Sequence, residues 1–145
     1  MKILVTAADS ALGTLLCQQL AREHDVDPTG RNETADVNRY QCLDLTDSEA
    51  VAKVLEGVET VVHAVPCAVG ESREQNEQKL LDWVSRSTYV LTTEACKTEV
   101  RRIVLLSTLD MMRSYDERYI VTTDWQPRPR ANADTLAPYM AELVG

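Results

Sequence analysis

The sequence has no phenylalanine and no long hydrophobic run. A helix that spans a membrane needs about 18 or more consecutive apolar residues, and no segment approaches that length. The apolar run after Met1, residues 3–5, is also too short for the core of a secretory signal peptide. We therefore expect a cytoplasmic protein without a membrane-spanning segment.

Cysteine and histidine are sparse. The four cysteines lack the C-x-x-C or Cys/His pairing of a zinc site and the spacing of a small disulfide framework, so we expect no metal centre. Each lies in an apolar segment, which favours buried free thiols at Cys17, Cys42, Cys67 and Cys96. His63 lies in an apolar run, where we expect a hydrogen-bonded core histidine instead of a metal ligand or general base.

Positive charge is scarce as well. Fifteen lysines and arginines stand against 23 acidic residues, which gives a formal net charge of −8. This balance offers no basic surface for a phosphate backbone or an anionic membrane, so we expect neither nucleic acid nor membrane as a partner. With 145 residues, 44% of them hydrophobic, the chain suffices for one core, and we predict a single domain over residues 1–145.

Short apolar runs alternate with amphipathic segments along the chain. The runs predict strands over residues 2–6, 24–29, 40–43, 58–65 and 102–107. The amphipathic segments predict helices over residues 11–23, 46–57, 72–97 and 134–144. Residues 109–133 show no sustained period and are predicted to form a loop. Strands that alternate with helices predict the α/β class, with a parallel sheet of about five strands.

Local signals suggest where three of these helices begin, end or face the core. Residues 46–49, Thr-Asp-Ser-Glu, have the capping-box form, which predicts Thr46 as an N-cap. Gly57 is expected to end that helix in a left-handed conformation. Asp134 is the predicted cap of the last helix. In the first helix, the predicted inward stripe is Leu12, Leu15, Leu16 and Leu20.

Five short motifs occur in a characteristic order. The first strand is followed by Thr-Ala-Ala-Asp-Ser-Ala-Leu-Gly at residues 6–13, and Asp-Leu-Thr-Asp stands at 44–47. Val-Val-His-Ala lies at 61–64, a strand ends in Ser-Thr at 107–108, and Pro-Tyr stands at 138–139. Together they resemble the front half of the extended short-chain dehydrogenase/reductase family, which includes nucleotide-sugar epimerases and dehydratases. The resemblance implies a Rossmann-type, doubly wound sheet of order 3-2-1-4-5 with helices on both faces, without the family's substrate-binding region.

The resemblance also implies a nicotinamide dinucleotide cofactor, whose pyrophosphate lies at the N-terminus of the first helix. Ala7 and Ser10 stand at the first two glycine positions of the family motif, and only Gly13 is kept. Two interpretations stay open: weak binding assisted by the Ser10 hydroxyl, or a plain connector that binds no cofactor. The implied cofactor-binding residues are Thr6, Ala7, Asp9, Ser10, Ala11, Leu12, Gly13, Arg31, Asp44, Leu45, Ala64 and Val65.

Two of these residues bear on which dinucleotide would bind. Arg31 follows the second strand, where no acid stands, and this favours NADP over NAD; the alternative is a solvated surface charge. By resemblance Asp44 contacts the adenine, and the alternative is a turn or capping carboxylate.

The family's catalytic group joins a Ser or Thr, a Tyr, and a Lys four residues after the Tyr. Thr108 and Tyr139 stand at the first two positions, and Leu143 replaces the lysine. No tyrosine of this chain has a lysine four residues later. Without that ammonium group, we expect poor proton transfer by the phenol at neutral pH.

Three functions therefore stay open. The chain is an NADP-linked oxidoreductase or epimerase, a non-catalytic sensor of a dinucleotide or small molecule, or an assembly unit that keeps only the fold. In the family, the helices that correspond to residues 72–97 and 134–144 form a dimer surface, so we expect a homodimer. Trp83 and Tyr89 lie off the inward stripe of the first of these helices, where they would suit a partner.

Overall fold

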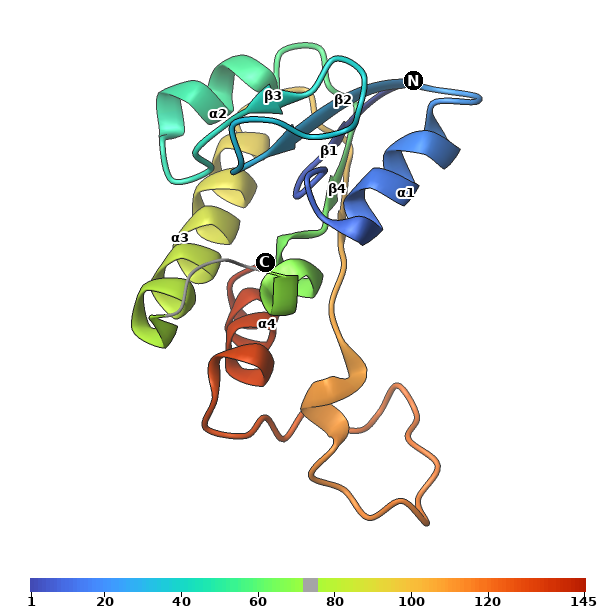
Figure 1. Cartoon of the computed structure of the whole chain (residues 1–145), viewed down its shortest axis with the longest axis vertical. Coiled ribbons are helices and arrows are strands. Elements are labelled where there is room, and N and C mark those ends of the chain that lie inside the picture. The colour runs from blue at the N-terminus through green and yellow to red at the C-terminus, as the bar shows by residue number, and fades with distance from the viewer. Residues whose placement is uncertain (72–75) are drawn as a thin grey trace.

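A parallel sheet forms the centre of the computed structural model, which describes residues 1–71 and 76–145 (Figure 1). Its strands are β1 (Lys2–Val5), β2 (Asp25–Gly30), β3 (Gln41–Cys42), β4 (Thr60–His63) and β5 (Arg102–Leu105). They lie in the order β3-β2-β1-β4-β5, and every pairing is parallel. The predicted fold class and strand order are confirmed. The apolar β1 lies in the middle because both of its faces are covered.

The strand register brings the segments that carry the sequence motifs to one edge. Val5 of β1 pairs with Pro28 of β2 on one side and with Val62 of β4 on the other. Val62 in turn pairs with Val104 of β5. Because parallel strands in register end together, the turns that follow them meet at the same edge of the sheet. We call this the carboxyl edge.

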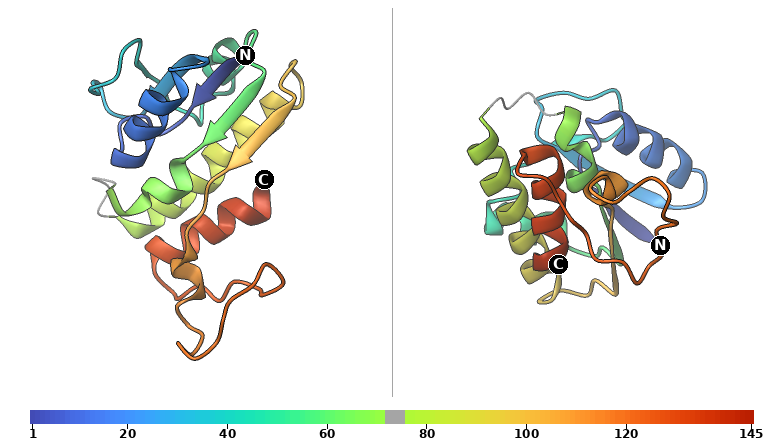
Figure 2. Two further views of the ribbon diagram at one scale, coloured as in Figure 1. Left: turned by 90° about the vertical axis from the view of Figure 1, so that its right-hand side faces the viewer. Right: turned by 90° about the horizontal axis from the view of Figure 1, so that it is seen from below.

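Helices cover both faces of the sheet (Figure 2). The helix α1 (Ala11–Leu20) lies on one face, and α2 (Ser48–Val54), α3 (Glu77–Ala95) and α4 (Ala133–Val144) lie on the other. The short 3-10 helices η1 (Val65–Glu71) and η2 (Leu109–Met112) follow β4 and β5. No helix among the described residues is long and apolar enough to cross a membrane.

The two faces have separate cores. Beneath α1, Ile3 and Val5 pack with Cys17 and Val26. The larger core, between the sheet and α2, α3 and α4, includes Leu4, Leu55, Val61, Val84, Leu91, Ala137 and Ala141. The small side chains of Ala137 and Ala141 are fully buried, and α4 packs closely along α3. The last helix is therefore part of the core.

The predicted inward stripe of α1 is only partly correct. Leu16 and Leu20 pack against the core, whereas Leu12 and Leu15 are 37% and 53% exposed. The buried residues of α1 are Gly13 and Cys17, because the absence of a side chain at Gly13 lets this helix face approach the sheet closely. Leucine spacing alone could not show which side of the stripe makes that approach.

Two of the predicted caps are one or two residues off. Asp47, not Thr46, caps α2 by accepting hydrogen bonds from the amides of Glu49 and Ala50, while the Thr46 hydroxyl donates to Asp44 at 2.8 Å.

Asn132, not Asp134, caps α4. Its Oδ1 accepts the Thr135 hydroxyl at 2.7 Å and the Thr135 amide at 3.2 Å. Both caps place a carboxylate or amide oxygen where a free helix amide needs one. Gly57 has the predicted left-handed conformation, with φ of +70°, but α2 ends earlier than predicted, at Val54.

Several elements are shorter than predicted. The predicted strand over residues 58–65 is β4 plus the start of η1, and β3 keeps two residues, both exposed at the sheet edge. The long helix begins at Glu77; residues 72–75 of the prediction lie outside the described residues. Within the predicted loop, η2 is the regular element that the structure adds.

Cys17 is buried and Cys67 half-buried, but Cys42 and Cys96 are exposed, so the prediction of four buried thiols is wrong for two.

Candidate functional site at the carboxyl edge

The turn between β1 and α1 has the backbone shape that a glycine motif normally supplies. Ala7 has φ of +52°, in the left-handed region that costs a residue with a Cβ about 1–2 kcal/mol. The turn is held by the Ser10 amide, which donates to the Ala7 carbonyl at 3.0 Å, and by the Ala8 amide, which donates to Thr29 of β2 at 2.8 Å. The surrounding hydrogen bonds therefore impose the glycine conformation on an alanine.

Gly13 allows α1 to lie directly on this turn. A Cβ at Gly13 would come 2.6 Å from the carbonyl carbon of Ala7 and 2.8 Å from the Cα of Ala8, and closer still to the Ala7 carbonyl oxygen. All of these are backbone atoms, which cannot move aside without displacing the turn. The only motif glycine that this chain keeps is thus the one required for packing of the helix on the strand.

The Ser10 side chain is directed back into its own turn. Its hydroxyl donates to the Ala7 carbonyl at 2.7 Å and accepts the Gly13 amide at 3.0 Å, so Ser10 is the N-cap of α1. The residue is 6% exposed. Two hydrogen bonds therefore hold the hydroxyl within the turn, where it caps the Gly13 amide at the N-terminus of α1.

Asp9 connects this turn to the end of β2. Its Oδ2 accepts the backbone amides of Arg31 at 3.0 Å and Asn32 at 2.8 Å. Gly30 leaves the space for this contact, because a Cβ there would lie 2.5 Å from the Asp9 carboxyl carbon and 2.7 Å from the Tyr40 hydroxyl. That hydroxyl donates to the Asn32 carbonyl at 2.7 Å. Burial, and then the nearby Asp9 carboxylate, raise the pKa of Tyr40.

Arg31 lies between the carboxyl edge and α3. Its guanidinium carbon is 4.9 Å from the centre of the Trp83 ring, a cation–π distance. Trp83 is half-buried and packs against the larger core, so it is covered from within the chain. Tyr89 of the same helix is 59% exposed. The two aromatic residues that the sequence analysis grouped together thus have different surroundings.

His63 joins β1, β4 and α3 in the core, as expected for a structural histidine. Its Nδ1 is 2.9 Å from the Thr6 hydroxyl and its Nε2 is 3.0 Å from the Thr88 hydroxyl. The Thr88 hydroxyl proton is used, since it donates to Val84 at 2.8 Å, so Nε2 carries the hydrogen and Nδ1 accepts from Thr6. Complete burial lowers the pKa of His63 to about 3.

The remaining predicted cofactor residues divide into an exposed and a buried group. Ala11 and Leu12 are exposed at the start of α1. Asp44 forms a local turn, in which its Oδ1 accepts the Thr46 amide at 2.9 Å. The buried group, at most 2% exposed, consists of Thr6, Leu45, Ala64 and Val65. The structure brings the turn residues and Arg31 together at the carboxyl edge through Asp9.

Thr108 and Tyr139 lie on adjoining elements, beyond β5. The Thr108 hydroxyl caps η2 by accepting the Asp110 amide at 3.2 Å. Tyr139 is half-buried on α4, which contacts η2. Leu143, one turn later, is 70% exposed and carries no amine. Sequence reasoning missed Ser107, whose buried hydroxyl has no hydrogen-bond partner among residues 1–71 and 76–145.

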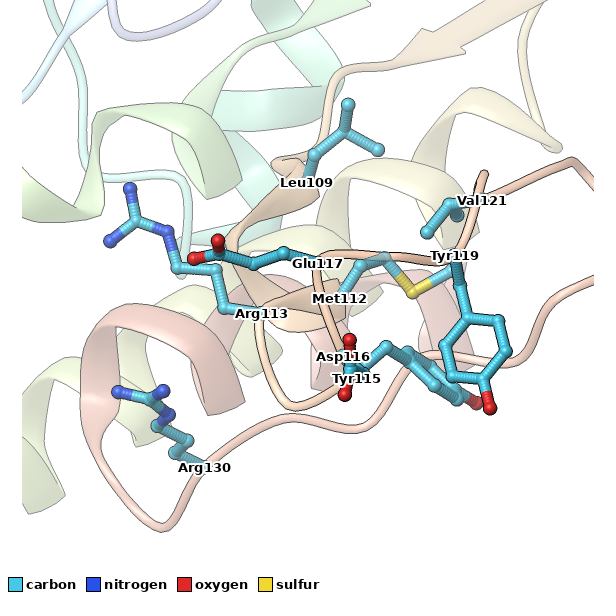
Figure 3. Close-up of a pocket in the computed structure, with 9 residues that line it drawn as sticks. All are labelled: Leu109, Met112, Arg113, Tyr115, Asp116, Glu117, Tyr119, Val121 and Arg130. Carbon is cyan, nitrogen blue, oxygen red and sulfur yellow. The ribbon is translucent and has the colours of Figure 1, made fainter.

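A hollow lies in the segment that follows β5 (Figure 3). Its volume is about 580 Å³, and Figure 3 shows Tyr115 and Tyr119 on one side with Arg113 and Arg130 on the other. Trp125 packs on Tyr115 with ring centres 4.6 Å apart, which helps hold the segment in place. The sequence showed no period here and so gave no sign of the hollow. In the part of the chain that the structure describes, no group of three or more His, Cys, Asp or Glu residues could hold a metal ion.

The motifs and the fold both match one family. A family model described as the NAD dependent epimerase/dehydratase family matches residues 3–141. The chain belongs to the NAD-dependent epimerase/dehydratase family. No curated protein sequence matches this epimerase/dehydratase-family chain.

Solved structures of about twice the length share the fold of this epimerase/dehydratase-family chain. One is a short-chain dehydrogenase/reductase superfamily protein from Agrobacterium tumefaciens with bound NAD (TM-score 0.81, 19% identity). The match covers 99% of this chain and 44% of that one. Two others are UDP-glucose 4-epimerases. One is from Thermotoga maritima with UDP-glucose (TM-score 0.79, 18% identity), and the other is from Thermus thermophilus with NAD (TM-score 0.76, 19% identity). Each of these two matches covers 99% of this chain and 49% of the other chain. The chain thus spans about half the length of these structures.

Proposed function

We propose that this chain binds a nicotinamide dinucleotide at the carboxyl edge of its sheet. The observation that carries the proposal is the turn between β1 and α1, where Ala7 keeps the left-handed conformation of a glycine and α1 begins directly behind it. A helix N-terminus carries partial positive charge and donates backbone hydrogen bonds, so it favours the pyrophosphate. Solved structures of the same fold are described with bound NAD.

The substitutions in the motif are compatible with a pyrophosphate. Ala7 adds a single methyl group that is buried, at 6% exposure. The Ser10 hydroxyl is bonded within the turn, to the Ala7 carbonyl and the Gly13 amide, and Ser10 is 6% exposed. Ala11, the first residue of α1, is exposed. The residues that would lie against the pyrophosphate are those of the turn and the start of α1, residues 7–12.

Catalysis by this chain is proposed to be weak. When bound, a nicotinamide supplies hydride exchange, while proton transfer is left to protein side chains. Thr108 and Tyr139 are the groups of this chain that would hold or move that proton. Leu143 places an exposed apolar side chain where the family has its lysine, so no ammonium group assists the phenol. Binding with little turnover favours the sensor function over the oxidoreductase.

Calorimetric titration of the full chain with NADH and with NADPH tests this proposal. Ala11→Glu puts a carboxylate at the N-terminus of α1, where it would repel the pyrophosphate and yet favour the helix. Ala11→Gln is the matched neutral control. We expect the wild type and Ala11→Gln to bind at least one dinucleotide, and Ala11→Glu to lose at least about tenfold in affinity, from like-charge repulsion of about 1.4 kcal/mol or more.

If neither NADH nor NADPH bound the wild type at millimolar concentration, the proposal would be refuted. Equal affinity of Ala11→Glu and Ala11→Gln would place any observed binding elsewhere on the chain. Circular dichroism of both variants ensures that a lost titration signal reflects the site and not the fold.

We also propose that α3 and α4 form a homodimer surface. The two helices pack side by side, and Tyr89 and Leu143 are 59% and 70% exposed on them. Large exposed apolar side chains of this kind are common at protein interfaces. A monomer mass by light scattering at high protein concentration would rule the dimer out.

A further inference from the structure

Asp9 reaches from one strand end to the next. It belongs to the turn after β1, but its carboxylate lies at the end of β2, where it accepts the amides of Arg31 and Asn32. Its carboxyl group also lies against Gly30, whose missing side chain makes room for it. The position of this carboxylate is thus set by two hydrogen bonds and one close contact, and not by its place in the sequence motif.

The end of the second strand is the place where Rossmann-type proteins distinguish NAD from NADP. An acid there accepts the ribose 2′-hydroxyl of NAD, and an arginine accommodates the 2′-phosphate of NADP. In this chain the strand ends in Gly30, Arg31 and Asn32, without an acid. The carboxylate at this point is that of Asp9, which comes from the neighbouring turn.

The backbone donors that would attract a 2′-phosphate are already occupied. The amides of Arg31 and Asn32 form a pair of donors suited to an anion, and both are taken by Asp9. The Arg31 guanidinium lies over the Trp83 ring. A phosphate at these two amides would be repelled by the Asp9 carboxylate, whereas a hydroxyl could donate to that carboxylate.

We infer that Asp9 makes the chain select NAD over NADP, by accepting the ribose 2′-hydroxyl and repelling a 2′-phosphate. This inference rests on the proposed function, and it reverses the preference that Arg31 alone suggested. It identifies the selecting acid as a residue of the turn that holds the pyrophosphate. Ribose selection and pyrophosphate binding then depend on one short segment, residues 7–13.

The test compares the affinities of NADH and NADPH for the full-length wild type and for Asp9→Asn. Asparagine keeps an oxygen that can accept the same two amides, so the variant removes the charge and keeps the link to β2. Glu33→Gln is the matched control, because it removes an exposed charge of the same sign two residues after Arg31. Arg31→Gln tests the competing assignment of selection to the arginine.

We expect the wild type to bind NADH more tightly, and Asp9→Asn to shift the ratio of the two dissociation constants toward NADPH by at least about tenfold. Glu33→Gln and Arg31→Gln should leave the ratio within about twofold, because neither removes the carboxylate. An unchanged ratio in Asp9→Asn, an equal shift in Glu33→Gln, or a selective loss of NADPH affinity in Arg31→Gln would overturn the inference while leaving dinucleotide binding intact. Absence of binding by every variant and the wild type would instead refute the proposed function, and the inference with it.

Discussion

Replacement of Gly13 by alanine should destabilise the protein far more than the same replacement at Gly57. At Gly13 the new methyl group would overlap the backbone of Ala7 and Ala8, at 2.6 Å from a carbonyl carbon and 2.8 Å from a Cα. At Gly57 a Cβ would meet nothing within 4 Å, and the cost is that of φ at +70° for a residue with a side chain. One site thus tests steric overlap and the other tests left-handed strain alone.

The expected magnitudes follow from these two situations. Overpacking in a rigid environment costs about 1–3 kcal/mol. The added methyl group would also push α1 away from the turn and weaken the hydrogen bond of the Ser10 cap, which contributes about 1 kcal/mol. We therefore expect the free energy of unfolding to fall by about 3 kcal/mol in Gly13→Ala. Left-handed strain predicts a loss of about 1 kcal/mol in Gly57→Ala. A domain of ordinary stability, about 5–15 kcal/mol, would still fold with either change.

Urea unfolding followed by far-UV circular dichroism measures both losses. The midpoint of Gly13→Ala should lie clearly below that of Gly57→Ala, with similar slopes. If Gly13→Ala lost no more stability than Gly57→Ala, the close packing of α1 on the turn would be wrong, and with it the reason given for keeping this glycine.

Two further predictions concern the core histidine and the last helix. Burial holds the pKa of His63 near 3 in the folded protein, whereas the pKa is about 6.5 in the unfolded chain. The stability that neutral His63 provides is therefore complete above pH 6.5 and is lost as the pH falls toward 3, with a loss of about 2 kcal/mol at pH 5. His63→Gln should flatten the fall in unfolding free energy between pH 7 and 5, and His24→Gln should retain it; an equal fall in all three proteins would contradict the assignment. For α4, Asn132→Ala should cost about 1 kcal/mol by removing the cap, and Asp134→Ala should cost less, since Asp134 contributes only a charge to the first turn. A larger loss in Asp134→Ala, measured by urea unfolding, would restore the cap assigned from the sequence.

Much of the fold was predictable because its signals are local. Apolar runs of strand length, separated by helical periods, indicated a parallel sheet, and the motif order implied its strand order. His63 was predictable as a core residue for the same reason, since it lies within an apolar run. The errors occurred where two neighbouring residues could serve one purpose. Thr46 and Asp47, or Asn132 and Asp134, can all cap a helix, and only the backbone path decides which oxygen reaches the free amides.

The site was less predictable because its contacts join distant parts of the chain. The motif placed Ala7, Ser10 and Gly13 at the start of the first helix, but it did not show that the Ser10 hydroxyl is bonded within the turn. The stacking of Arg31 on Trp83 joins residues far apart in the sequence, so a residue read as a phosphate ligand or a surface charge has a third role. Exposure of Cys42 and Cys96 also depends on how the sheet edge and the end of α3 are covered.

The sequence by itself determined the class of fold, the family and the loss of the lysine at position 143. Each of these depends on residue types and on spacings within one segment, which the chain order already contains. The tertiary structure alone decided where Asp9 acts, because its two amide partners lie more than twenty positions away and meet it only when β1 and β2 pair in parallel. Hydrogen bonds act over about 3 Å of space whatever the separation along the chain, so the selection that we assign to Asp9 follows from strand pairing and not from the motif.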